Sequence, residues 1–143
     1  MEQTYFNYNL KPNLNIDDFY VGNSNINAFN ILIKNQITNN KLLLVGPKKS
    51  GKTHLGLIWK SQFNAISYKN NMKDIINCKK NILVDDLFYD LIEENIFHLI
   101  NHYDLNNIKI LITCHELLNT HKFKLNDLSS RLRAASHSLA CCL

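Results

Sequence analysis

Glycine and proline are scarce in this chain, which has 4 Gly and 2 Pro among 143 residues. That scarcity excludes collagen-like and Gly/Pro-rich disordered chains. No apolar run approaches the ~18 residues that a membrane-spanning helix needs. The start, Met1-Glu2-Gln3, lacks the charged-then-apolar layout of a signal peptide. We therefore expect a soluble cytoplasmic protein without a membrane partner.

The sequence also lacks closely spaced cysteine pairs and a dense cluster of basic residues. The four cysteines form no Cys-x-x-Cys pair: Cys78, Cys114, Cys141 and Cys142. This pattern excludes a zinc knuckle and a disulfide framework, and it favours reduced thiols. The formal net charge of +4 comes without a dense basic stripe. Such a balance permits a phosphate-bearing ligand but does not indicate sequence-specific DNA binding.

Short apolar runs alternate with stretches of helical periodicity. Residues 1–18 are polar and predict an extended arm, and residues 19–143 predict one α/β domain. The expected strands cover 42–45, 65–68, 82–84 and 108–113, with a last apolar run at 138–143. The expected helices cover 24–40 (buried face Ile26, Phe29, Ile33 and Ile37), 52–63, 72–78, 90–103 and 124–135. This alternation predicts a parallel sheet flanked by helices.

The strongest motif lies between the first strand and the helix that follows it. The eight residues match G-x-x-x-x-G-K-[ST] without a mismatch: Gly46, Pro47, Lys48, Lys49, Ser50, Gly51, Lys52 and Thr53. Glycines let the loop bend so that backbone N–H groups and the helix N-terminus point at phosphate oxygens. The lysine reaches the β- and γ-phosphates, and the threonine hydroxyl binds Mg²⁺. The sequence therefore predicts a P-loop.

A pair of carboxylates follows a second buried strand. Asp85 and Asp86 come directly after residues 82–84. In P-loop proteins a strand of this kind carries an acid to the metal ion. We assign Asp85 to the Mg²⁺ shell and Asp86 to polarisation of the attacking water. A second acid beside the first favours hydrolysis or switching over phosphoryl transfer to a small acceptor.

Taken together, these stretches resemble the AAA+ ATPase domain of the DnaA/Hda family. The matching segments follow family order, namely residues 18–25 (DFYVGNSN), 42–55 (LLLVGPKKSGKTHL), 82–87 (ILVDDL) and 128–135 (LSSRLRAA). The resemblance implies a P-loop NTPase sheet of which only the large subdomain is present. It also implies ATP or ADP with Mg²⁺ as cofactors.

The resemblance further implies roles for single residues. Tyr20, Val21 and Gly22 would lie beside the adenine. Thr113 is the nearest match to the sensor-1 polar residue, although its neighbours Cys114 and His115 depart from the family pattern. Arg131 matches the arginine finger, which in this family acts on a neighbouring subunit's nucleotide. Arg131 and Arg133 are the two arginines of the chain, and an always-charged guanidinium suits a developing phosphate charge.

Two further expectations concern the ends of the chain. The segment from Gln3 to Leu10 resembles a diverged sliding-clamp-binding peptide of Hda-type proteins, and a random arm with several aromatics fits it equally well. At the other end, the family's helical lid and the DNA-binding domain of DnaA are not expected. Without a lid, nucleotide binding and self-assembly should be weaker.

Three functions compete on this evidence. The leading hypothesis is an Hda-like regulator that contacts DnaA and promotes hydrolysis of DnaA-bound ATP, with weak or absent ATPase activity of its own. The second is a P-loop ATPase of the helicase-loader type. The third is a lidless module that binds DnaA or the clamp without hydrolysis. Outside these sites, we interpret His98 and His102 as surface histidines rather than zinc ligands, and Cys114 as an inert core thiol.

Overall fold

The computed structural model describes residues 15–69 and 72–139. Its centre is a five-stranded parallel sheet with the order β2-β3-β4-β1-β5. The strands are β1 (Lys41–Val45), β2 (Ile66–Ser67), β3 (Ile82–Val84), β4 (Ile110–Cys114) and β5 (Ser136–Leu139). Since all strands run the same way, the loops that leave their carboxyl ends share one edge of the sheet, where α/β proteins bind ligands.

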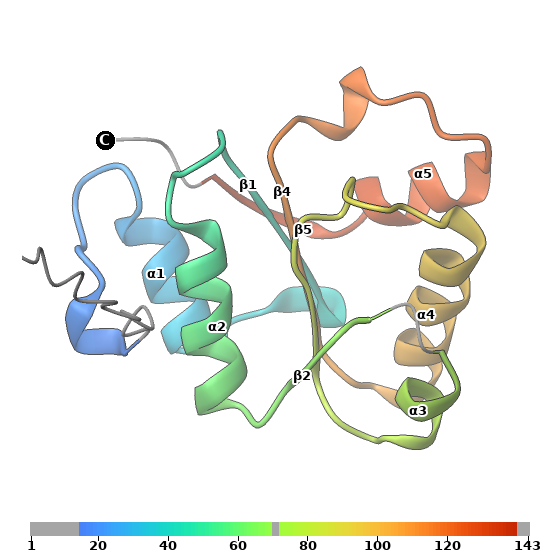
Figure 1. Ribbon diagram of the computed structural model, residues 1–143, viewed down its shortest axis with the longest axis horizontal. Coiled ribbons are helices and arrows are strands. Elements are labelled where there is room, and N and C mark those ends of the chain that lie inside the picture. The colour runs from blue at the N-terminus through green and yellow to red at the C-terminus, as the bar shows by residue number, and fades with distance from the viewer. Residues whose placement is uncertain (1–14, 70–71, 140–143) are drawn as a thin grey trace, which may run out of the picture.

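Helices cover both faces of this sheet (Figure 1). On one face lie α1 (Ile26–Ile33) and α2 (Lys52–Gln62). On the other face lie α3 (Met72–Asn77), α4 (Glu93–Asn106) and α5 (Asn126–Arg133). Short 3-10 turns occur at η1 (Ile16–Asp18), η2 (Thr38–Asn40) and η3 (Leu118–Thr120). The predicted α/β architecture is confirmed.

The two faces hold two separate cores, and β1 contributes to both. Leu42 and Leu44 pack with α1 and α2, in the cluster that contains Trp59. Leu43 and Val45 point the other way, into the cluster that contains Ile96 and other residues of α4. Successive side chains of a strand face opposite sides. A sheet covered on both faces therefore needs an uninterrupted apolar run, as β1 has.

Several predicted boundaries need correction. The expected helix over 24–40 ends at Ile33, and its buried residues are Ala28 and Leu32, whereas Ile26 is 43% exposed. The chain leaves the helix because Asn35 adopts a left-handed backbone (φ 51°).

The expected helix over 90–103 runs instead from Glu93 to Asn106. Asp90 has a φ of 53° and Ile92 is extended, so the helix cannot begin earlier. The last apolar run forms β5, which begins at Ser136 rather than at 138 and pairs with β1. Ile16–Asp18, at the end of the expected arm, form η1.

The proposed clamp-binding segment Gln3–Leu10 lies outside the described residues, as do Cys141 and Cys142. Among the helices that the structure describes, none is both long and apolar enough to cross a bilayer.

Candidate nucleotide-binding site

The P-loop connects β1 to α2, at the carboxyl edge of the sheet. Gly46 follows β1 and donates its N–H to the carbonyl of Cys114 at the end of β4 (3.2 Å). Gly51 adopts φ 84°, a region that side chains disfavour, and α2 begins at the next residue. A Cβ at Gly51 would also lie 3.3 Å from the Phe19 ring. Its backbone conformation therefore favours glycine here, and the Phe19 ring leaves little room for a side chain.

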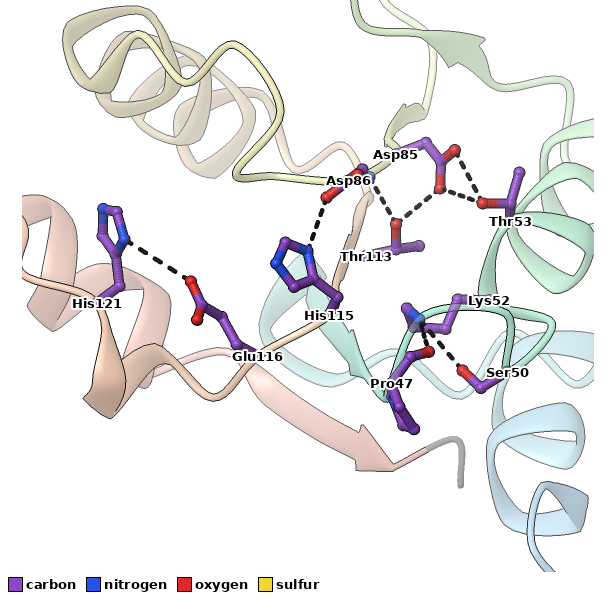
Figure 2. A network of polar contacts seen from close by, with 10 residues as sticks. All are labelled: Pro47, Ser50, Lys52, Thr53, Asp85, Asp86, Thr113, His115, Glu116 and His121. Atoms are coloured by element: carbon purple, nitrogen blue, oxygen red, sulfur yellow. Dashed lines mark hydrogen bonds and ion pairs between the residues drawn. The ribbon is translucent and has the colours of Figure 1, made fainter. Parts of the chain in front are cut away.

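The Lys52 side chain lies inside this loop and is 9% exposed. Its ammonium donates to the Pro47 carbonyl at 2.5 Å and to the Ser50 hydroxyl at 3.2 Å (Figure 2). A buried ammonium needs oxygen acceptors, and here the loop supplies them itself. A phosphate would offer the same ammonium stronger, charged acceptors.

Asp85 lies opposite the first turn of α2. Its two oxygens are each 3.1 Å from the Thr53 hydroxyl. Its Oδ1 also accepts a hydrogen bond from the Thr113 hydroxyl at 2.7 Å, and Figure 2 shows all three side chains converging. A hydroxyl and a carboxylate at this separation are the hard oxygen ligands that Mg²⁺ prefers. The predicted metal pair is thus brought together by β3 and α2.

Thr113 also holds the backbone of the second acidic residue. The backbone N–H of Asp86 donates to the Thr113 hydroxyl at 2.8 Å, and Thr113 is 1% exposed. Asp86 itself has a φ of 55°, an unusual conformation of the kind that gathers at functional sites. Thr113 therefore connects both acidic residues to the end of β4.

His115 is a site residue that the sequence analysis did not single out. Its Nδ1 lies 3.2 Å from Asp86 Oδ1 (Figure 2). An ionised carboxylate can only accept, so this contact makes Nδ1 the protonated nitrogen. The clue in the sequence was its position two residues beyond Thr113, at the end of the same strand. The Asp86–His115 pair places a second polar group at the phosphate end of the site.

These elements enclose a cavity of about 300 Å³. Its lining is Lys48, Lys49, Lys52, Thr53, Asp86, Thr113 and His115. Three lysines in one small cavity suit a polyphosphate, because they offset several negative charges at once. The Thr53–Asp85 pair beside them suits a divalent cation. The residues therefore fit the phosphate portion of a nucleotide together with Mg²⁺.

The Tyr20–Gly22 segment lies next to the P-loop. Phe19 stacks on Phe29 of α1 (centroids 5.8 Å apart) and meets His54 of α2 edge-on (5.2 Å). These contacts dock the segment between α1 and α2. Tyr20 and Val21 are 70% and 37% exposed, so their side chains face solvent just after Phe19, which lies against Gly51 of the P-loop. This position is compatible with a base.

Arg131 is far from this cavity. Its Nη1 lies 3.5 Å from Asp104 Oδ2, and its guanidinium lies 5.6 Å from the centre of the Phe97 ring. The same Asp104 oxygen accepts from Lys41 at 3.1 Å. Lys41 is the first residue of β1, whereas the P-loop follows its last residue. At about 3.3 Å per residue, β1 places Lys41 and the start of the P-loop roughly 13 Å apart.

The remaining candidates behave as structural residues. His98 is exposed, and His102 Nδ1 lies 3.3 Å from the Asn106 amide. Within the described ranges, no three His, Cys, Asp or Glu side chains gather as a metal-binding group. Cys114 is fully buried, and burial raises its pKa to about 11. The thiol stays protonated and is a poor nucleophile near neutral pH.

Comparisons with known proteins find structural but not sequence relatives. No protein-family model matches the sequence, and no curated protein matches it. AMPPCP-bound DnaA from Aquifex aeolicus matches with a TM-score of 0.76 at 16% identity, over 92% of this chain and 50% of that one. Domain III of DnaA from Thermotoga maritima gives 0.72 at 19% identity, over 90% and 67%. The DnaC helicase loader gives 0.58 at 17% identity, over 92% and 97%.

The fold and the site together define a P-loop α/β domain, and its fold is the one seen in the DnaA and DnaC structures. At these identities the likeness is one of fold, and it extends to both an initiator and a helicase loader. The chain spans about half the length of the Aquifex DnaA structure. The expected P-loop sheet is confirmed.

Proposed function

We propose that this chain binds ATP or ADP with Mg²⁺ and acts in DNA replication as an Hda-like regulator that promotes hydrolysis of DnaA-bound ATP. The observation that carries the proposal is the position of Arg131 at the opposite end of β1 from the chain's own P-loop. Its guanidinium contacts Asp104 and Phe97 rather than residues of its own P-loop, so the nucleotide on which it acts would be bound by another chain. The AAA+ fold shared with DnaA supports a partner of the same type.

In the proposed function, each residue of the site has its own role. The P-loop N–H groups and Lys52 bind phosphate oxygens, and Thr53 and Asp85 hold the cation. Tyr20 and Val21 lie against the base, and Thr113 fixes the Asp85 carboxylate and the Asp86 backbone. Asp86 orients water, although intrinsic turnover is expected to be slow. On DnaA-bound ATP, Arg131 of this chain would stabilise the charge that develops on the γ-phosphate.

The test is hydrolysis of ATP preloaded on the cognate DnaA, with sliding clamp loaded on DNA. Wild type should accelerate hydrolysis, and Arg131→Ala should abolish the acceleration while sparing nucleotide binding by this chain. Arg133→Ala is the matched control, since Arg133 is exposed on the same helix two residues away. Equal stimulation by wild type and Arg131→Ala would refute the arginine-finger role.

A helicase-loader-type ATPase is the second candidate. One observation favours it, because the alignment covers 97% of the DnaC helicase loader. It predicts ATP turnover stimulated by single-stranded DNA and strongly weakened by salt. A non-hydrolysing module that binds DnaA or the clamp would instead show partner binding that is indifferent to Lys52→Ala.

A further inference from the structure

Asn25 is a buried polar residue at the N-terminus of α1, yet it does not cap that helix. Its exposure is 5%, and its side chain makes no capping bond to the first turn. Asparagine at this position usually accepts a hydrogen bond from the second or third helical N–H. The amide of Asn25 is therefore used for something else.

Both halves of the Asn25 amide bind the preceding turn. The Gly22 N–H donates to Asn25 Oδ1, and Asn25 Nδ2 donates to the Tyr20 carbonyl, each at 2.9 Å. The Asn25 and Ile26 N–H groups also donate to the Gly22 carbonyl, at 3.2 and 3.0 Å. Tyr20 and Gly22 are thus fixed to α1, and the Val21 peptide between them is held on both sides.

The same turn is also held in place relative to the P-loop. Phe19 lies against Gly51 of the P-loop and against His54 of α2. The exposed Tyr20 and Val21 therefore directly follow a residue that is packed against the P-loop. A base that extends from phosphates bound in the P-loop would meet a backbone edge that cannot easily adjust.

We infer that Asn25 is a positioning residue for nucleobase selection, which acts by fixing the backbone of Tyr20–Gly22. The inference rests on the proposed nucleotide function. Adenine presents a donor at N6 beside an acceptor at N1, and guanine presents the reverse. A fixed peptide edge discriminates between them because the wrong base leaves its polar groups unpaired. A loose edge rotates to suit either base, so selectivity depends on the Asn25 hydrogen bonds.

The test compares three ligands by titration calorimetry: Mg·ATP, Mg·GTP and inorganic tripolyphosphate. Wild type should prefer ATP. Asn25→Ala should reduce the ATP-over-GTP preference by about 10-fold, since two hydrogen bonds are lost, while tripolyphosphate affinity stays at the wild-type value. The matched control is Asn23→Ala, an exposed residue of the same turn, which should leave all three affinities unchanged.

Asn25→Asp guards against misfolding of the alanine variant. It keeps an acceptor for the Gly22 N–H but replaces the donor to the Tyr20 carbonyl by an oxygen, so it too should lose selectivity. An unchanged ATP-to-GTP ratio in both variants would overturn the inference, as would a parallel loss of tripolyphosphate binding, which indicates a structural role alone. Failure of wild type to bind any of the ligands would instead refute the proposed nucleotide function itself.

Discussion

At the scale of single residues, Lys52 carries the strongest consequence for binding. Its ammonium is bound to oxygens of its own loop, and a phosphate would replace them. Lys52→Ala removes the one lysine that the P-loop motif aims at the β- and γ-phosphates. We expect nucleotide binding to fall below detection by calorimetry. Lys60→Ala, on the same helix, should bind normally, and retained binding by Lys52→Ala would refute the P-loop assignment.

Thr113 contributes both to the stability of the fold and to the binding of Mg²⁺. Thr113→Val keeps the shape but deletes the hydroxyl that bridges Asp85 Oδ1 and the Asp86 N–H. A buried N–H that loses its partner costs about 1–3 kcal/mol. We expect that loss in urea unfolding, together with a weaker Mg²⁺ dependence of nucleotide affinity. Thr113→Ser retains the hydroxyl and should restore the Mg²⁺ dependence. Equal Mg²⁺ dependence in the valine variant would contradict this role.

At the scale of elements, the contact of α2 with the sheet depends on one glycine. A Cβ at Gly56 would lie 3.0 Å from Leu83 Cδ1, and Leu83 is 1% exposed. Alanine would gain about 1 kcal/mol of helix propensity. Overpacking a tightly filled core costs about 1–3 kcal/mol, and the buried leucine has little room to move. The packing cost should therefore exceed the gain in propensity.

Gly56→Ala is accordingly expected to lower the free energy of unfolding by about 1 kcal/mol. Ser61→Ala, on an exposed position of the same helix, should change it by no more than about 0.5 kcal/mol. Urea unfolding of both variants measures the difference. A Gly56→Ala variant more stable than wild type would show that α2 has space to shift away from β3.

At the scale of the whole molecule, two buried weakly acidic side chains make the free energy of unfolding decrease at alkaline pH. Burial raises the pKa of Tyr103 to about 12 and that of Cys114 to about 11. The unfolded chain releases these protons near pH 10 and pH 9, whereas the folded chain retains them. The unfolded state thus binds fewer protons in that window, and stability falls as pH rises.

We expect unfolding free energies that are unaffected by these two groups below about pH 9 and that decline from there toward about pH 12. Tyr103→Phe removes one of the two groups, together with the hydrogen bond from its hydroxyl to the Lys80 carbonyl (3.0 Å). That variant should start less stable and lose less with pH. Urea unfolding at about pH 8 and about pH 10.5 tests both statements, and parallel pH profiles would contradict them.

Where sequence reasoning succeeded, the signal was local. Runs of apolar residues located β1, β3 and β4 to within two residues, because a strand covered on both faces has no polar position to blur its limits. The boundaries of α1 and α4 were wrong for a common reason. Asn35 and Asp90 take left-handed conformations. The spacing of apolar residues along the sequence does not indicate where the backbone departs from the helix.

The same distinction between local and tertiary signals applies to the residues of the candidate site. Its phosphate and metal residues form a motif of fixed spacing, so their neighbourhood was predictable from eight consecutive residues and one Asp pair. His115 and Asn25 received no site role from the sequence, although His115 lies two residues beyond Thr113 and Asn25 ends the matching segment 18–25. Each acts through a side chain whose partners are set by the packing of other elements, namely β3 against β4 for His115 and the turn before α1 for Asn25.

The sequence by itself determined the α/β class, the P-loop and the acids that accompany it, because local spacing and hydrophobic patterning dictate each of these. Only the tertiary structure decided that β5 pairs with β1, that Thr113 joins the Asp85 carboxylate to the Asp86 backbone, and that Arg131 lies at the opposite end of β1 from the phosphate cavity. These features depend on the strand order β2-β3-β4-β1-β5. Strand order follows from which helices cover which face, a balance of burial summed over the whole chain that no single segment records.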